Sequence, residues 1–242
     1  MNHIVALSGG KDSSAMALRL AEVNPEIDYR YICTPTGDEL PDMVDHWVRL
    51  KEVLGKPVIP ITRHSLKSVC DTNNMLPNFR TRFCTRQIKI EPFIAYVLDH
   101  VPATVYVGLR ADEEARTGAI YGDVDGVVQR FPLHEWDWGL TEVRGYLQDK
   151  GITMPPRTDC ARCFFQRLGE WYDLWRDWPD IFQDAVEQEE EIGHTFRSPG
   201  RDTWPADLKS LGQLFQAGRI PTGASVQLKL FGPDLRDSTC RV

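Results

Sequence analysis

Short apolar runs alternate with helical periodicities over the first two thirds of the chain. The run at residues 3–7 stops at a Ser-Gly-Gly turn, and Met16, Leu20 and Val23 then recur at positions i, i+4 and i+7. That spacing is typical of one apolar face of a helix. The pattern therefore predicts a strand, a tight turn and a helix.

The same unit recurs along the chain. Further apolar runs at residues 27–33, 57–62 and 104–108 predict strands, and apolar residues at helical spacing lie between them, namely Met43, Trp47, Leu50 and Leu54, then Ile90, Ile94 and Val97. Strands this apolar that alternate with helices favour a mostly parallel sheet. We therefore expect an α/β fold, an open sheet with helices on both faces.

The last third of the chain has a different character. Strand signals fade after residue 140, and Leu168, Trp171 and Trp175 fall at helical spacing. An acidic stretch at 184–191 and a further helical segment at 208–215 follow. The sequence predicts an α/β domain at residues 1–140, with the C-x-x-C segment and helical C-terminal region of residues 141–242 packed on it.

Charge and composition narrow the classes of function. The 242 residues include 28 basic and 35 acidic side chains, a net charge of −7, so any anion site must be local. No apolar stretch approaches the roughly 20 residues that a membrane span requires, so we expect a cytoplasmic protein that makes no membrane contact. The cytosol keeps thiols reduced, so the six cysteines indicate metal binding or catalysis.

The most specific signal is the segment at residues 8–14, called the phosphate loop below. Here a strand ends and a helix begins, so backbone N–H groups and the helix dipole favour a bound phosphate. The glycines allow close approach of the backbone, and Lys11 adds a point charge. The alternative is a polar turn with a helix cap. The loop comprises Ser8, Gly9, Gly10, Lys11, Asp12, Ser13 and Ser14.

This loop differs from the Walker A pattern. It resembles the pyrophosphate loop of the adenine nucleotide α-hydrolases, also called N-type ATP pyrophosphatases. The resemblance implies an α/β fold of that type, binding of ATP with Mg²⁺ or of a related adenylyl nucleotide, and chemistry at the α-phosphate.

Four further segments, in order, resemble the 3′-phosphoadenosine 5′-phosphosulfate (PAPS) reductase-like branch of that superfamily. They lie at residues 36–41, 83–92, 108–113 and 132–136. The resemblance implies that Thr36, Gly37, Asp38, Gly108 and Arg110 join the phosphate loop in holding the nucleotide. It also implies that Lys11 and Arg110 act on the phosphates during catalysis.

A basic cluster interrupts the acidic composition. No acidic residue lies between Asp71 and Glu91, a stretch that contains Arg80, Arg82, Arg86 and Lys89. We expect some of these cations to contact a phosphate- or sulfate-bearing ligand. A solvated helix face is the alternative.

The cysteine spacing indicates a metal centre. Cys160 and Cys163 form a C-x-x-C pair, a spacing that lets two thiolates reach one metal. The family resemblance places Cys84 as the third ligand, of a [4Fe–4S] cluster that would bind or relay sulfur. Zinc with an outside fourth ligand, a redox dithiol and no metal at all remain alternatives.

Three functions are compatible with these patterns. The first is an ATP pyrophosphatase that adenylates an acceptor for sulfur transfer, as in DNA phosphorothioation or another thiolation. Its partners would be a sulfur donor such as a cysteine desulfurase and a nucleic-acid acceptor delivered by partner proteins. The second is a PAPS or adenylyl-sulfate reductase that uses Cys240 as its nucleophile. The third is a nucleotide-binding subunit without catalysis.

Overall fold

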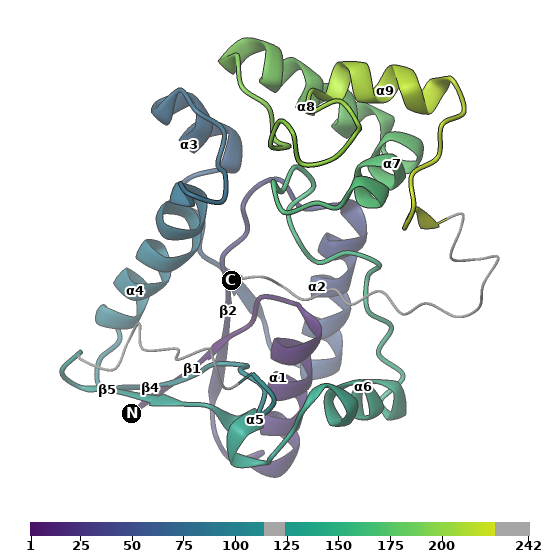
Figure 1. Ribbon diagram of the computed structural model, residues 1–242. Helices are drawn as coiled ribbons and strands as arrows, with labels where there is room; N and C mark the ends of the chain where they lie inside the picture. The colour runs from purple at the N-terminus through teal and green to yellow at the C-terminus, as the bar shows by residue number, and fades with distance from the viewer. Residues whose placement is uncertain (114–123, 226–242) are drawn as a thin grey trace. The chain divides into compact units, whose positions relative to one another are not determined.

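The computed structural model describes residues 1–113 and 124–225 (Figure 1). These residues form two compact units. Unit 1 contains residues 1–63 and the described part of 88–158, and unit 2 contains residues 64–87 and 159–225. Cys240 lies outside the described residues.

Unit 1 is built on a five-stranded sheet with the strand order β3-β2-β1-β4-β5, in which every pair is parallel. The order places β1 at the centre, where Val5 aligns with Tyr31 of β2 and with Tyr106 of β4. The strands are β1 (Asn2–Ala6), β2 (Tyr29–Cys33), β3 (Val58–Pro60), β4 (Ala103–Tyr106) and β5 (Val127–Arg130). The predicted open parallel sheet is confirmed.

Helices cover both faces of this sheet. One face is covered by α1 (Lys11–Val23), α2 (Pro41–Leu54), α5 (Pro132–Glu135) and α6 (Leu140–Asp149), and the other by α4 (Glu91–Leu98). Successive side chains of β1 enter opposite cores, because Ile4 packs with Phe93 of α4 while Val5 packs with Met16 of α1. The two-sided burial explains why these strands are almost wholly apolar.

Helix α6 belongs to unit 1, although the sequence analysis grouped residues 141–149 with the helical C-terminal region. Its Val143 and Leu147 are buried in the core that α1 and Leu133 share. Figure 1 shows α6 beside α1. After its return at residue 88, the chain stays in unit 1 up to residue 158.

Unit 2 is helical, as the sequence predicts for the C-terminal part. It contains α3 (Leu66–Asn73), α7 (Leu168–Asp177), α8 (Pro179–Ile192) and α9 (Leu208–Gln216), and the π-helix η1 (Thr85–Ile90) carries the chain into α4. Trp171, Phe182 and Phe215 are buried in it. The tryptophan spacing therefore marks a core-facing helix. None of the helices in the described ranges is long and apolar enough to span a bilayer.

Candidate functional site

The strand order locates the candidate site in unit 1. In an open parallel sheet, ligands bind beyond the carboxyl ends of the strands, where neighbouring strands send the chain to opposite sides. In this sheet β1 lies between β2 and β4. The segments that follow β1 and β4 therefore border the crevice, and they contain residues 8–14, which include the first turn of α1, and residues 108–113.

The turn of the phosphate loop requires glycine at position 9. Gly9 has a φ of +82°, a left-handed conformation. A Cβ atom there would lie 2.2 Å from Met43 Cε and 2.4 Å from Trp47 Nε1. Trp47 Nε1 also donates a hydrogen bond to Ser8 O at 3.2 Å. Helix α2 therefore fixes the turn from outside.

The hydroxyl groups of the loop hold its backbone in place. Ser13 Oγ accepts a hydrogen bond from Gly9 N and donates one to Gly10 O, both at 3.1 Å. Ser8 Oγ lies 2.9 Å from Ser13 Oγ and accepts a hydrogen bond from Gly10 N at 3.3 Å. Both serines thus rigidify the turn, and their contact with a ligand stays a prediction.

A histidine that the sequence analysis did not identify lies behind the loop. His46 of α2 is 1% exposed, and its Nε2 lies 3.4 Å from Ser14 Oγ. Burial, helped by the positive charge of Arg49, lowers the pKa of His46 to about 4, against a hydrogen bond with the Gly9 backbone. The imidazole is therefore neutral near pH 7. One histidine among polar helix positions gives no sequence signal of this contact.

The first turn of α1 carries two opposite charges. Lys11 is 6% exposed, and its Nζ lies 3.9 Å from Asp12 Oδ2. The first hydrogen bond of the helical ladder runs from Ser14 N to Gly10 O at 2.9 Å. The backbone N–H groups that precede it are those that an α-helix does not use internally, and such groups favour an anion.

Arg110 ties the loop after β4 to this helix. It is 6% exposed, and its NH1 donates hydrogen bonds to both carboxylate oxygens of Asp12, at 3.2 and 3.1 Å. Its Nε donates to Asp112 at 2.8 Å, and its NH2 pairs with Glu113 at 3.2 Å. Burial opposes the charge, but these carboxylates raise the pKa of Arg110. The structure thus places this arginine among three acidic side chains.

Asp112 links Arg110 to helix α6 through hydrogen bonds. Its Oδ2 accepts a hydrogen bond from Leu140 N at 3.0 Å, at the start of that helix. Burial acts to raise the pKa of Asp112, but the hydrogen bonds from Arg110 and Leu140 outweigh it and lower the pKa. The carboxylate therefore stays ionised and bridges α6 to the arginine.

Gly108 permits the two loops to approach each other. A Cβ atom at position 108 would lie 3.0 Å from both Ser13 Cα and Ser13 N. This approach is tighter than ordinary van der Waals contact, and the neighbour is backbone. Only glycine fits without a shift, which explains why the residue carries a sequence signal.

The loop after β2 holds the remaining predicted nucleotide-binding residues. Thr36 is 2% exposed, and its N and Oγ1 donate to Glu39 Oε1 at 2.6 and 2.7 Å. Gly37 N donates to Glu39 Oε2 at 3.0 Å. Asp38 is buried as well. Glu39, which the sequence analysis did not single out, thus organises this loop with its carboxylate.

In unit 2, aromatic contacts bring the segment of Cys84 against the C-x-x-C segment. The Phe79 ring lies 5.4 Å from that of Phe164 and 4.9 Å from that of Phe165, edge-on to both. Cys163 N donates to Cys160 O at 3.2 Å, so the C-x-x-C forms a turn. The three cysteines Cys84, Cys160 and Cys163 are half-buried.

The thiols as placed do not complete a metal site. Across residues 1–113 and 124–225, no group of three or more His, Cys, Asp or Glu side chains is arranged to hold a metal ion. The described donors therefore give the predicted [4Fe–4S] cluster, and the zinc alternative, no support of their own. The metal assignment stays a prediction.

Comparison with known proteins adds a family match. The family model described as "Phosphoadenosine phosphosulfate reductase domain" matches residues 2–173, a range that includes the phosphate loop and the C-x-x-C. The crystal structure of a phosphoadenylyl-sulfate (PAPS) reductase from Candida auris, in a phosphate complex, is similar at 19% sequence identity and a TM-score of 0.47. That similarity covers 64% of this chain and 75% of the Candida chain. No curated protein matches the chain.

Proposed function

The chain belongs to the phosphoadenosine phosphosulfate reductase domain family, and from this premise we propose that it is an ATP pyrophosphatase. Membership itself supports a nucleotide-binding function in sulfur chemistry. In the proposed reaction, ATP adenylates an acceptor, pyrophosphate leaves, and the activated acceptor receives sulfur.

The phosphate loop is the observation that carries this proposal. Its turn places the N-terminus of α1 and the buried Lys11 at the carboxyl end of the central strand. Backbone amides, a helix dipole and one ammonium group form a site suited to a polyphosphate. The loop lacks the Walker A spacing, which is consistent with attack at the α-phosphate.

The proposed step is an in-line displacement at the α-phosphorus of Mg²⁺-ATP, the substrate. An acceptor oxygen forms a bond to this phosphorus, and the bond to the bridging oxygen of the β-phosphate breaks. Pyrophosphate carries away the electron pair, and the α1 amides with Lys11 stabilise its negative charge. A persulfide sulfur then attacks the activated acceptor, the bond from the acceptor to the AMP oxygen breaks, and AMP leaves. A thiol reductant cleaves the resulting acceptor–S–S–cysteine disulfide, which leaves one sulfur on the acceptor and frees the donor cysteine.

Arg110 has two roles open to it in this reaction. In one, it balances charge at the α-phosphate. In the other, it remains with Asp12 and Asp112, as the structure has it, and positions the first turn of α1. Only the first role would require Arg110 to leave the three carboxylates that surround it.

The sulfur donor and acceptor follow from the same proposal. A cysteine desulfurase would supply the persulfide. A nucleic acid would serve as acceptor, as in DNA phosphorothioation, and partner proteins would deliver it because the chain carries a net charge of −7.

The test follows the ³²P label of the α-phosphate from ATP into AMP, together with the pyrophosphate released. With [α-³²P]ATP, a persulfide donor and an oligonucleotide acceptor, we expect AMP and pyrophosphate, with no ADP. Lys11→Met should lower pyrophosphate release about 100-fold, the order of loss for one such stabilising donor. Lys51→Met, at an exposed position of α2, is the matched control. ATP binding without any pyrophosphate would contradict the proposal and favour a nucleotide-binding subunit without catalysis.

A PAPS or adenylyl-sulfate reductase is the second candidate, and the family description itself favours it. Here a cysteine thiolate attacks the sulfur of the sulfonucleotide and the S–O bond breaks. The nucleotide departs, and the cysteine becomes an S-sulfocysteine. A dithiol reductant such as thioredoxin then releases sulfite. If the protein forms sulfite from PAPS and Cys240→Ser abolishes this formation, the reductase activity is established in place of the first.

A further inference from the structure

We propose that unit 2 binds single-stranded nucleic acid on an exposed surface of phenylalanine rings and arginines. This aromatic–arginine surface consists of Phe79, Arg80, Arg82, Phe165 and Arg201, with Phe164 packed beneath. It extends the proposed function, because it gives the acceptor a place on this chain. Its test requires no turnover.

The rings form a rigid support. Phe164 is 3% exposed and lies 4.3 Å from Phe165 between ring centres. Phe79 stands edge-on to both, at interplanar angles of 84° and 85°. Packing of aromatic rings at near-perpendicular planes is favourable. Phe79 therefore packs against both rings without any ligand.

Phe79 presents apolar surface to solvent. It is 50% exposed, whereas the other aromatic rings of Phe, Tyr and Trp in the described ranges are buried or half-buried. Half of the Phe79 side chain stays exposed although its ring packs against both Phe164 and Phe165. An exposed aromatic face is what an unstacked nucleobase packs on.

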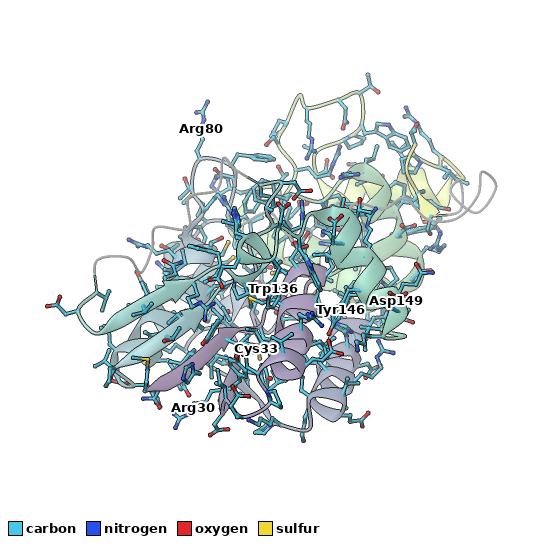
Figure 2. All side chains as sticks on the ribbon, turned by 90° about the horizontal axis from the view of Figure 1, so that it is seen from below. Arg30, Cys33, Arg80, Trp136, Tyr146 and Asp149 are labelled. Atoms are coloured by element: carbon cyan, nitrogen blue, oxygen red, sulfur yellow. The ribbon has the colours of Figure 1, made fainter. Side chains whose placement is uncertain are left out.

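Positive charge surrounds the rings. Arg82 Cζ lies 5.0 Å from the centre of Phe165, and Arg201 Cζ lies 6.0 Å from the centre of Phe79. Figure 2 shows the Arg80 side chain projecting from the surface. Asp202, the acidic neighbour of Arg201, pairs with Arg197 at 2.7 Å. Asp202 is therefore paired with Arg197, although its charge also acts on Arg201.

The two segments that form the surface are basic in an acidic protein. Residues 72–87 and 160–169 contain no Asp or Glu, and their arginines are Arg80, Arg82, Arg86, Arg162 and Arg167. Alternating rings and cations suit a strand whose bases stack while its phosphates face arginine. An acidic partner protein would be attracted by the arginines, but its binding would not require an exposed aromatic ring.

The position of the cysteines agrees with this ligand. Arg82 lies two residues before Cys84, and Phe164 follows Cys163 directly. A nucleic-acid strand bound on the aromatic–arginine surface would therefore lie next to the thiol-bearing segments of the same unit. Duplex nucleic acid keeps its bases stacked internally, so the surface should prefer single strands.

The experiment is fluorescence anisotropy with the full chain and a labelled 20-nucleotide oligothymidine, without ATP, over a salt series. We expect single-strand binding that weakens with salt, with a log–log slope of about −2 for roughly three phosphate contacts. Phe79→Ala should weaken binding about 5- to 100-fold and leave the slope unchanged. Arg80→Ala should reduce the slope by about 0.7.

Two controls make the result decisive. Ile220→Ala and Arg49→Ala change an exposed apolar and an exposed basic residue elsewhere, and both should bind as the unsubstituted chain does. Thermal unfolding of each variant verifies folding. The proposal is overturned if the oligonucleotide does not bind at low salt, if Phe79→Ala changes affinity less than twofold, or if polyglutamate competes as well as oligothymidine. Loss of pyrophosphate release with intact strand binding would instead refute only the proposed ATP chemistry.

Discussion

The phosphate loop of unit 1 and the aromatic–arginine surface of unit 2 are assembled in different ways. The phosphate loop is contiguous, because seven neighbouring residues supply its turn, its hydroxyls and its charge. The surface joins residues 86 positions apart, Phe79 and Phe165, through a contact between their rings. A contiguous site depends on the conformation of a few residues. An assembled site depends on packing, so the two should respond differently to substitution.

The largest expected effect comes from Gly9→Ala. The left-handed conformation costs an alanine about 1 kcal/mol, and its Cβ would collide with Met43 and Trp47. A loop displaced by about 1 Å should lose about 100-fold in affinity for a non-hydrolysable ATP analogue, measured by calorimetry.

Gly55→Ala is the matched control. Gly55 also has a positive φ, of +63°, but nothing lies within 4 Å of a Cβ there. This variant should lose a little stability and keep its nucleotide affinity. Equal losses of affinity in both variants would mean that backbone strain alone, and not the packing of α2 on the loop, determines the site.

The second prediction concerns the thiol-bearing segments. The cysteine pattern predicts iron and sulfide in anaerobically purified protein, and Cys160→Ala should remove most of both. Cys33→Ala is the control, because Cys33 is buried in the sheet, and burial raises the pKa of its thiol to about 12. Metal analysis provides the measurement. Colourless, iron-free protein after anaerobic purification would leave the C-x-x-C as a thiol pair or a zinc ligand.

The third prediction concerns the stability of unit 2. Burial raises the pKa of Glu189 from 4.5 to about 7, although Leu208 N and Phe196 N donate hydrogen bonds to it at 2.7 and 2.8 Å. Between these pH values the folded state binds more protons than the unfolded state. Stability should therefore fall by about 3 kcal/mol as pH rises from about 4.5 to 7.

Hydrogen exchange of the α8 amides across this pH range would measure the effect locally. Glu189→Gln should flatten the profile. Glu190→Gln, at an exposed ion pair with Lys209, should retain it. A profile that Glu189→Gln leaves unchanged would assign the pH dependence to another group.

The smallest effect is expected at the tie between Asp12 and Arg110. A double-mutant cycle with Asp12→Asn and Arg110→Met, followed by urea unfolding, should show a coupling energy of about 1–2 kcal/mol. Nucleotide affinity then separates the two roles of Arg110. If Arg110 only positions α1, both single variants lose affinity alike. If it contacts phosphate, Arg110→Met loses far more.

The sequence predicts what is local and periodic. The apolar runs at residues 3–7, 27–33, 57–62 and 104–108 correspond to β1 to β4 within a few residues. Strand β5 escaped prediction because it is short and half-exposed, with Val128 52% exposed. Helix α3 escaped as well, because it spans only eight residues and its signal is one capping serine, Ser65.

Contacts between distant residues could not be predicted. The pairing of Asp12 with Arg110 joins residues 98 positions apart, and the place of His46 behind Ser14 follows from how α2 packs on α1. Sequence spacing indicated which residues carry charge but not which charges neutralise one another. The sequence therefore predicted Arg110 as a phosphate ligand without its three carboxylate neighbours.

Glu39 has a consequence for selectivity. Because its carboxylate already engages both backbone amides and the hydroxyl of the Thr36–Gly37 turn, that loop is preorganised. In the proposed nucleotide complex, this loop would then lose little conformational entropy on binding. Discrimination between ATP and a sulfonucleotide at this loop would therefore depend on shape complementarity. Ligand-induced ordering would contribute little, because the loop is already ordered.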